Sequence, residues 1–110
     1  MEVTMVDIKQ EFLDRGTSAI SNSLDKLVSK ERMSREEADS AFSRITSSVD
    51  LESLSDCDLV VEAIPEIPEL KFSTFSRLDS ICKPKAILAS NTSSISINEI
   101  ASHTNRADRV

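Results

Sequence analysis

The sequence predicts an α/β fold, a parallel sheet with flanking helices, because two kinds of hydrophobic pattern alternate along its 110 residues. Short apolar runs, typical of buried strands, are separated by longer stretches in which apolar residues recur every three or four positions. The predicted order is β-α-α-β-β-α-β-α. Strands that alternate with helices in this way favour a parallel sheet covered by helices.

The first half of the chain contains four predicted elements. A strand over 2–7 ends in an acid and is followed by a long helix. A capping box, Ser34 with Glu37 three residues later, opens a second helix that runs to about Arg44. A short edge strand over 45–50 follows. The long helix has one apolar or small face, on which Gly16 favours close packing against a sheet: Phe12, Leu13, Gly16, Ala19, Ile20, Ser23, Leu24, Leu27 and Val28.

The second half adds two strands and two helices. The run Asp58–Glu62 is a compact apolar segment bounded by acids, typical of a buried parallel strand. Pro68 suits the first turn of the next helix, which Lys83-Pro84-Lys85 ends. A strand over 86–89 and a short helix over 97–103 follow. The apolar face of the longer helix comprises Leu70, Phe72, Phe75, Leu78, Ile81 and Cys82.

Composition excludes several classes of protein. The formal net charge of −6 argues against a general nucleic-acid or anionic-membrane binder. We see no apolar run long enough to span a membrane and no signal-peptide pattern at Met1. Cys57 and Cys82 fit no metal-ligand spacing, so we expect no metal site and reduced thiols in an intracellular protein.

The segment Ser90-Asn91-Thr92-Ser93-Ser94 is the strongest candidate for a functional site. It joins a predicted strand to a predicted helix, which is where ligands bind in open α/β sheets. Its backbone N–H groups can face an anion, and its hydroxyls can donate or accept hydrogen bonds. The alternative is an ordinary turn in which one Ser or Asn caps the following helix.

Three segments together resemble the NAD-binding domain of the 3-hydroxyacyl-CoA dehydrogenases, most closely the 3-hydroxybutyryl-CoA type. They are Val3-Thr-Met-Val-Asp7, Asp58-Leu-Val-Val-Glu-Ala-Ile-Pro-Glu66 with Lys71 after it, and Ala89-Ser-Asn-Thr-Ser-Ser-Ile-Ser-Ile97. The resemblance covers essentially the whole chain. It implies a Rossmann-type sheet, NAD as the cofactor, and oxidoreductase activity in fatty-acid or butanoate metabolism.

The resemblance also implies elements that these residues do not contain. The family opens with a strand and a Gly-x-Gly-x-x-Gly turn, whereas this sequence has one glycine. The family's His-Phe-x-Asn-Pro segment, which carries the catalytic His, is not found either. We therefore expect residues 1–110 to be an internal fragment, a partial NAD-binding domain without the first strand and without the helical C-terminal domain.

This expectation has a structural consequence. In the 3-2-1-4-5-6 order of such sheets, the first strand lies between the second and the fourth. Without it, the strands at Val3 and Leu59 each lose their central partner, and the sheet divides into two halves. Both strands then expose unpaired backbone along an apolar edge, so we expect the isolated chain to be marginally stable or to aggregate, unless these two strands pair directly with each other.

The resemblance assigns five residues to the cofactor. Asp7 would accept hydrogen bonds from the adenosine ribose, which favours NAD over NADP because a carboxylate repels a 2′-phosphate. Glu66 and Lys71 would line the nicotinamide side, and Asn91 would fix the loop or contact a ribose. Ser93 would orient the substrate oxygen beside the cofactor, as a catalytic residue but not a nucleophile. The plain alternatives are a solvated strand-end acid, a loop acid, a surface lysine and turn caps.

The same resemblance assigns the substrate contacts. Ser23 and Lys30 on the long helix would contact the CoA nucleotide, where a lysine suits the 3′-phosphate; otherwise they are a filler near the core and an exposed helix-end cation. His103 is not expected to be the catalytic base, since it lies only ten residues after Ser93. The substrate would be a 3-hydroxyacyl-CoA or 3-oxoacyl-CoA, and full-length members of the family are expected to be homodimers.

Three functions remain open from the sequence. The first is a fragment of a 3-hydroxyacyl-CoA dehydrogenase that is inactive alone. The second is a non-catalytic module that binds a nucleotide, CoA or a partner protein, and the third is an acidic α/β interaction domain. The sequence does not separate cytoplasm, mitochondrion and peroxisome.

Overall fold

Four short strands form two separate parallel pairs in a computed structural model that describes all residues from Met1 to Val110. The chain divides into two compact units, Met1–Ser53 and Leu54–Val110, and each is described by itself. Helices follow the strands in both units, so the predicted α/β class with parallel strands is confirmed.

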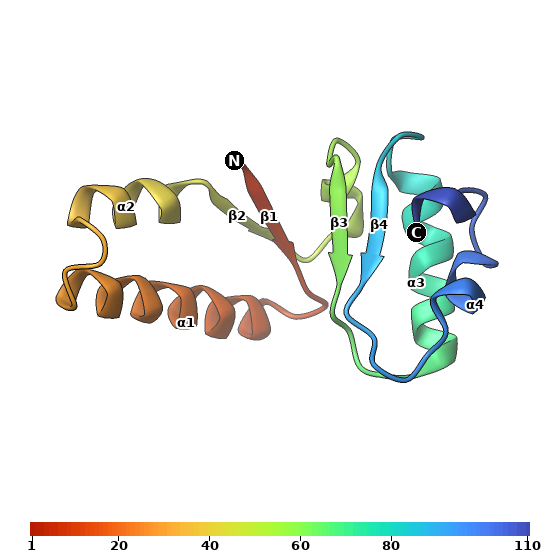
Figure 1. The fold of residues 1–110 in the computed structure, drawn as a ribbon, viewed down its shortest axis with the longest axis horizontal. Coiled ribbons are helices and arrows are strands. Elements are labelled where there is room, and N and C mark those ends of the chain that lie inside the picture. Colours follow the sequence, from red (N-terminus) through yellow and green to blue (C-terminus); the bar gives the residue numbers. More distant parts are fainter. The chain divides into compact units, whose positions relative to one another are not determined.

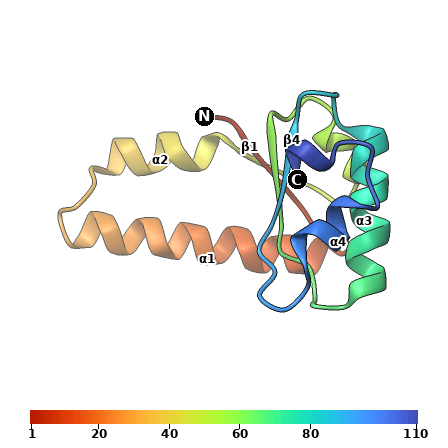
Figure 2. The same ribbon diagram turned by 45° about the vertical axis from the view of Figure 1, so that its right-hand side comes forward.

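The first unit contains β1 (Val3–Val6), α1 (Gln10–Ser29), α2 (Arg35–Ser43) and β2 (Ile45–Ser48). β1 and β2 pair in parallel, with Val3 opposite Ile45. α1 and α2 form a helical hairpin, in which the two helices lie side by side in both ribbon views (Figures 1 and 2). All four elements were predicted, and their observed ends lie within a few residues of the expected ones.

Two local predictions for this unit are confirmed. The Ser34 hydroxyl accepts from the Glu37 N–H at 3.0 Å, and the Glu37 carboxylate accepts from the Ser34 N–H at 3.3 Å, which is the capping box. An added Cβ at Gly16 would lie 3.2 Å from the Met5 methyl carbon, so the glycine lets α1 approach β1 closely.

The apolar face of α1 is narrower than predicted. Leu13 is its only buried residue, whereas Ala19 and Ser23 are exposed. The 3.6-residue period places both at the border of the apolar stripe, where small side chains do not reach the neighbouring helix. Ser23 is therefore not a core filler.

The second unit contains β3 (Leu59–Glu62), α3 (Pro68–Ile81), β4 (Ile87–Ser90) and α4 (Ile97–Ala101), with 3-10 turns at Leu51–Leu54, shared with the first unit, and Ala107–Arg109. β3 and β4 pair in parallel, and α3 lies along one face of the pair (Figure 1). α4 ends two residues earlier than predicted. The buried core of the unit comprises Leu54, Val60, Phe75, Leu78, Cys82, Ala86, Leu88, Ile100 and Ala101.

The division of the sheet predicted from the sequence is confirmed, because no ladder joins β1 to β3. Side chains alternate along β3, so that Val60 faces the core while Leu59 and Val61 are 56% and 61% exposed. Ile87 on β4 is 47% exposed as well. One face of this strand pair therefore exposes apolar side chains, and the marginal stability of the isolated chain stays a prediction.

Arg106 caps the C-terminal end of α3 with its guanidinium group. Its guanidinium is buried and donates to the Asp79 carboxylate at 2.6 Å. Its remaining four N–H groups donate to backbone carbonyls at 2.7–3.2 Å, those of Asp79, Cys82, Lys83 and Ala86. Carbonyls at a helix C-terminus lack intrahelical partners, and a cation is favoured there. The sequence pattern did not reveal this role.

Candidate functional site

Two loops leave the same edge of the second unit because β3 and β4 are parallel and in register. Glu62, the last residue of β3, lies opposite Ser90, the last residue of β4. The Asn91 N–H donates to the Glu62 carbonyl at 2.9 Å, which carries the pairing one step beyond the strands. The segment after β3 and the serine-rich segment after β4 therefore start side by side (Figure 1).

Glu66 joins the two loops through its carboxylate. Its Oε1 accepts the Thr92 hydroxyl at 2.7 Å, and its Oε2 accepts the Ser93 N–H and the Ser94 hydroxyl at 3.0 Å each. The backbone N–H groups of the serine-rich loop were expected to face an anion. The anion that they face in this structure is a carboxylate of the same chain.

This arrangement keeps Glu66 ionised. The Ser93 N–H and the Thr92 hydroxyl, with Lys71 and Ser94, hold the pKa of the Glu66 carboxyl far below its ordinary value, although partial burial opposes them. Hydrogen bonds donated to a carboxylate stabilise its charged form. The loop is thus organised around a permanent negative charge.

The Ser93 hydroxyl is the most easily released donor in this cluster. Four donors converge on Glu66 Oε2, whereas one carboxylate oxygen offers about two lone pairs. The Ser93 Oγ and the Ser94 N–H are the two most distant of the four, each at 3.3 Å. Because the hydroxyl of Ser93 is exposed and can rotate, it is the group that a ligand could recruit at least cost.

Asn91 and Ser96 show which side chains of the segment are free and which are used. Asn91 is exposed, and its side-chain amide makes no hydrogen bond within the chain. The residue that caps α4 is Ser96, which accepts from the Glu99 N–H at 3.4 Å. Helix capping is therefore not the role of Asn91 or Ser93, and the turn-cap alternative does not account for them.

Lys71 lies deeper than a surface lysine would. Its side chain is 1% exposed, and its ammonium lies 2.6 Å from Glu62 and 3.1 Å from Glu66. Burial lowers the pKa of the Lys71 ammonium, but the two carboxylates raise it by more, so the net direction is upward. Lys71 is therefore a buried cation between two carboxylates.

Glu62 also belongs to this cluster, although it was not among the predicted site residues. Its side chain is 1% exposed and accepts from the Ser90 hydroxyl at 2.5 Å and from the Ile64 N–H at 2.7 Å. One signal could have revealed it. Glu62 is two residues after Val60 on a strand, so both side chains point to the core, and a buried carboxylate needs a cationic partner.

The remaining predicted site residues belong to the first unit. Asp7 follows β1 and is exposed, and its Oδ1 accepts from the Ile8 N–H at 2.7 Å. Ser23 and Lys30 are both exposed, seven positions apart along α1 and its C-cap, and so share one side of the helix. None of the three contacts another predicted site residue.

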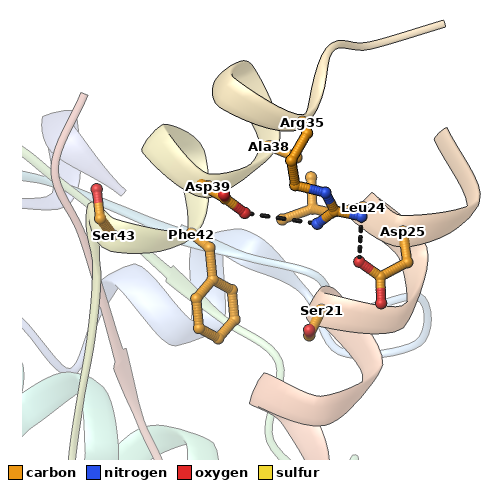
Figure 3. A pocket seen from close by; sticks show the side chains of 8 residues that line it. All are labelled: Ser21, Leu24, Asp25, Arg35, Ala38, Asp39, Phe42 and Ser43. Atoms are coloured by element: carbon orange, nitrogen blue, oxygen red, sulfur yellow. Dashed lines mark hydrogen bonds and ion pairs between the residues drawn. The ribbon is translucent and has the colours of Figure 1, made fainter. Parts of the chain in front are cut away.

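A pocket of about 290 Å³ lies between α1 and α2 in the same unit (Figure 3). Arg35 spans it, with 3.0 Å to Asp25 and 3.4 Å to Asp39, while the Phe42 ring points toward the space between the helices (Figure 3). None of the predicted site residues lines this pocket. Both carboxylates already neutralise its cation, so it offers no charged group to an anion.

Other kinds of site are not found in the structure. No group of three or more His, Cys, Asp or Glu side chains is placed to hold a metal ion. No helix combines the length and the apolar character that crossing a bilayer requires. His103 is exposed on the turn after α4, and its ring stacks on Phe72 with 4.2 Å between ring centroids.

Each unit, taken by itself, has polar groups that suit part of a dinucleotide. In the first unit, Asp7 has a carboxylate oxygen without a partner at the end of its strand. In the second, Asn91 has a free side-chain amide and Ser93 an exposed hydroxyl with one 3.3 Å hydrogen bond to Glu66. The phosphate-binding turn is not among these residues, because Gly16, the one glycine, is inside α1.

Comparison with known proteins identifies the class to which this site belongs. The family model for the 3-hydroxyacyl-CoA dehydrogenase NAD-binding domain matches residues 1–110. The chain belongs to this family, and NAD is its cofactor. The resemblance stated from the sequence motifs is confirmed, as is the Rossmann-like fold.

The particular relatives include 3-hydroxybutyryl-CoA dehydrogenases and multifunctional proteins of fatty acid beta-oxidation. A probable 3-hydroxybutyryl-CoA dehydrogenase of Deinococcus radiodurans is 46% identical over 105 residues, which are 96% of this chain and 37% of that protein. A peroxisomal fatty acid beta-oxidation multifunctional protein of Oryza sativa is 35% identical over 98% of this chain and 15% of its own length. The chain thus spans well under half of these relatives.

Solved structures give the same result. The 3-hydroxybutyryl-CoA dehydrogenase of Escherichia coli matches with a TM-score of 0.96 and 34% identity, over 99% of this chain and 23% of that one. The (S)-3-hydroxybutyryl-CoA dehydrogenase of Ralstonia eutropha matches with a TM-score of 0.95 and 39% identity, over 99% of this chain and 38% of that one.

Proposed function

We propose that this chain contributes to reversible hydride transfer between NAD and the C3 carbon of a 3-hydroxyacyl-CoA. The observation that carries the proposal is the Ser93 hydroxyl, exposed at the carboxyl end of a parallel strand pair and held near the fixed charge of Glu66. NAD accepts or supplies the hydride, and the protein supplies orientation.

Ser93 is the proposed catalytic residue of the chain. Its hydroxyl would hydrogen-bond the C3 oxygen of the substrate and orient it, without becoming a nucleophile. Glu66 limits the rotation of that hydroxyl, and Asn91 offers its free amide to the loop or to a ribose. Lys71 lies on the nicotinamide side, and since it is buried we propose that it acts through Glu66.

Asp7 is the proposed contact of the adenosine ribose. The Ile8 N–H fixes one carboxylate oxygen, which leaves the other to accept from ribose hydroxyls. A phosphate on the 2′ position would meet this negative charge directly. The same carboxylate therefore favours NAD over NADP.

Ser23 and Lys30 are the proposed contacts of the CoA nucleotide. Both are exposed and lie on one side of α1 and its C-cap. The ammonium of Lys30 would serve a phosphate as a point charge, and the Ser23 hydroxyl would add a hydrogen bond. The substrate class, a homodimeric assembly and an intracellular location are part of this proposal.

We also propose that these 110 residues do not catalyse the reaction by themselves. The glycine-rich turn is not among them, and their single histidine is stacked on Phe72 rather than placed beside Ser93. Other segments would supply the phosphate-binding turn, the general base and the helical domain. The chain would then be an internal part of a dehydrogenase.

The direct test is NADH binding and turnover of acetoacetyl-CoA by the natural protein. Asp7→Ala should weaken NADH binding about tenfold, because losing charge-assisted hydrogen bonds costs roughly 1.4 kcal/mol of binding free energy. Asp14→Ala removes the same charge from an exposed site on α1 and should leave the dissociation constant unchanged. Equal dissociation constants for Asp7→Ala and the natural protein would remove Asp7 from the site.

A non-catalytic module that binds a nucleotide or CoA is the second candidate. It is favoured by the absence of a free histidine base among the described residues. Saturable NADH binding by the natural protein without any oxidation in the presence of acetoacetyl-CoA would support it. Turnover that scales with protein concentration would exclude it.

A further inference from the structure

Lys71 is enclosed by acceptors of the chain itself. An ammonium group has three N–H donors, and three oxygens of the chain lie around Lys71 Nζ. Two accept hydrogen bonds, Glu62 Oε2 at 2.6 Å and the Ile64 carbonyl at 3.3 Å, and Glu66 Oε1 is an ion-pair partner at 3.1 Å. Because only 1% of its side chain is exposed, Lys71 acts on the site through its buried partners and not by contact with a bound molecule.

Glu62 links Lys71 to the second loop. One of its oxygens accepts from Lys71 and from the Ile64 N–H, and the other accepts from the Ser90 hydroxyl. The Ser90 oxygen in turn accepts from the Thr92 N–H at 3.2 Å. A single buried carboxylate therefore reaches the loop after β3 through Ile64 and the loop after β4 through Ser90.

The charges explain why the order of the loop depends on this pair. The cluster holds two carboxylates and one ammonium, and Lys71 lies between the carboxylates of Glu62 and Glu66. Without the ammonium, two like charges would remain near each other with little water, and the more exposed Glu66 would move out. Replacing a buried ion pair with apolar groups is often neutral for stability, so folding alone does not require it.

We propose that Glu62 and Lys71 are positioning residues that hold Glu66 against Ser93 and Ser94, so that the loop is formed before NAD binds. The proposal rests on the function proposed above and extends it to Glu62, which touches no ligand. A site formed in advance avoids the cost of ordering the loop on binding. The Ser93 hydroxyl is then presented in one place.

The test uses the double variant Glu62→Gln/Lys71→Met of the natural protein. Lys71→Met alone would leave a buried carboxylate without its cation, and unfolding would then obscure the result. In the double variant, the glutamine oxygen can still accept from the Ile64 N–H and its amide can donate to Ser90. The control is Lys83→Met, which removes a half-exposed lysine ion pair with Asp58 in the same unit.

Two quantities are measured. Hydrogen exchange of the Ser93 and Ser94 amides, without any ligand, should become at least tenfold faster in the double variant, while the Phe75 and Ile100 amides keep their rates. The dissociation constant for NADH should rise about tenfold. Lys83→Met should change neither. A readout confined to the loop is one that a purely structural pair would not produce.

Each outcome decides. Unchanged loop exchange and unchanged NADH affinity in a folded double variant would overturn the proposal. Faster loop exchange in a protein whose natural form binds no NADH would uphold the positioning role and refute the proposed function. If the double variant unfolds, Ser90→Ala replaces it, since it removes only the link from Glu62 to the loop. That variant should speed loop exchange about threefold, and no change would overturn the proposal.

Discussion

The two ends of α3 each hold a buried cation, and the comparison separates a network that closes within the fold from one that leads to the proposed site. At the C-terminal end, Arg106 uses all five donors on Asp79 and on four carbonyls. At the N-terminal end, Lys71 donates to Glu62 and to the Ile64 carbonyl and forms an ion pair with Glu66. Both cations are fully satisfied.

What differs is where each network ends. The partners of Arg106 are backbone groups and an acid that itself holds the Asn105 N–H, so its hydrogen bonds close within the fold. The partners of Lys71 lead through Glu66 to the exposed hydroxyls of Ser93 and Ser94. Full satisfaction of a buried cation therefore says little about its role. Its role is indicated instead by whether its hydrogen-bond network ends in exposed polar groups.

The largest expected effect on stability is at Arg106, whose hydrogen bonds all end within the fold; we call this the closed network. Arg106→Met should lower the free energy of unfolding by about 3–5 kcal/mol, because it leaves the Asp79 carboxylate and several carbonyls without their donor. Urea denaturation followed by circular dichroism measures it. Arg109→Met, which removes one exposed hydrogen bond to the Lys85 carbonyl, should cost less than about 0.5 kcal/mol. A loss below about 1 kcal/mol for Arg106→Met would contradict this account of the helix end.

The next largest effect on stability is at Lys71, whose network leads to the exposed hydroxyls of Ser93 and Ser94. Lys71→Met should lower the free energy of unfolding by about 3 kcal/mol, since it leaves the buried Glu62 carboxylate without its cation. Adding Glu62→Gln should recover more than half of that loss. The same denaturation series compares the single and double variants. If the second substitution recovers nothing, the loss comes from packing around Lys71 and not from the stranded charge.

The pH dependence of the closed network should be visible at low pH. Burial raises the pKa of the Asp79 carboxyl, but the Asn105 N–H and the Arg106 guanidinium lower it by more, so it lies below its ordinary value. A depressed folded-state pKa contributes stability above the unfolded-state pKa, and this is lost as the pH falls through the folded-state pKa. The stability advantage of the natural protein over Asp79→Asn should therefore shrink as the pH falls through and below the ordinary aspartate pKa of 3.8. An advantage that does not change with pH would refute the assignment.

The smallest effect on stability should come from the residue with the largest proposed role in the reaction. Ser93→Ala removes an exposed hydroxyl with one 3.3 Å hydrogen bond, so unfolding should change by no more than about 0.5 kcal/mol. Turnover of acetoacetyl-CoA by the natural protein should fall about tenfold, as expected for one lost hydrogen bond. Ser102→Ala, an exposed serine after α4, should change neither. Unaltered turnover in Ser93→Ala would remove it from the site.

The elements could be predicted from the sequence because each depends on a local signal. The spacing of apolar residues predicted the strands and helices, and the capping box of Ser34 and Glu37 predicted the start of α2. The division of the sheet was expected from the single glycine and the family's strand order, and the structure has two separate strand pairs. The helices, the strands and the capping box need only neighbours along the chain, whereas the divided sheet needed the family's strand order.

The polar clusters could not be predicted in the same way, because their partners are distant in sequence. Glu66 and Ser93 are 27 positions apart, and Arg106 and Asp79 are also 27 apart. A lysine within a helical pattern gives no sign that it will be buried, so Lys71 looked like a surface residue or a cofactor contact. The roles of Asp7, Ser23 and Lys30 stay predictions, since they depend on ligands.

The central claim is that Glu66 is the permanent anion of the serine-rich loop, and its titration tests that claim most directly. The amide signals of Ser93 and Ser94, followed by nuclear magnetic resonance as the pH is lowered, report the protonation of the carboxylate that they bind. We expect no transition near the ordinary glutamate pKa of 4.5, because the loop donors and Lys71 hold the pKa of Glu66 far below it. A transition of both amides close to 4.5 would show that Glu66 is not held by the loop, and the account would be wrong.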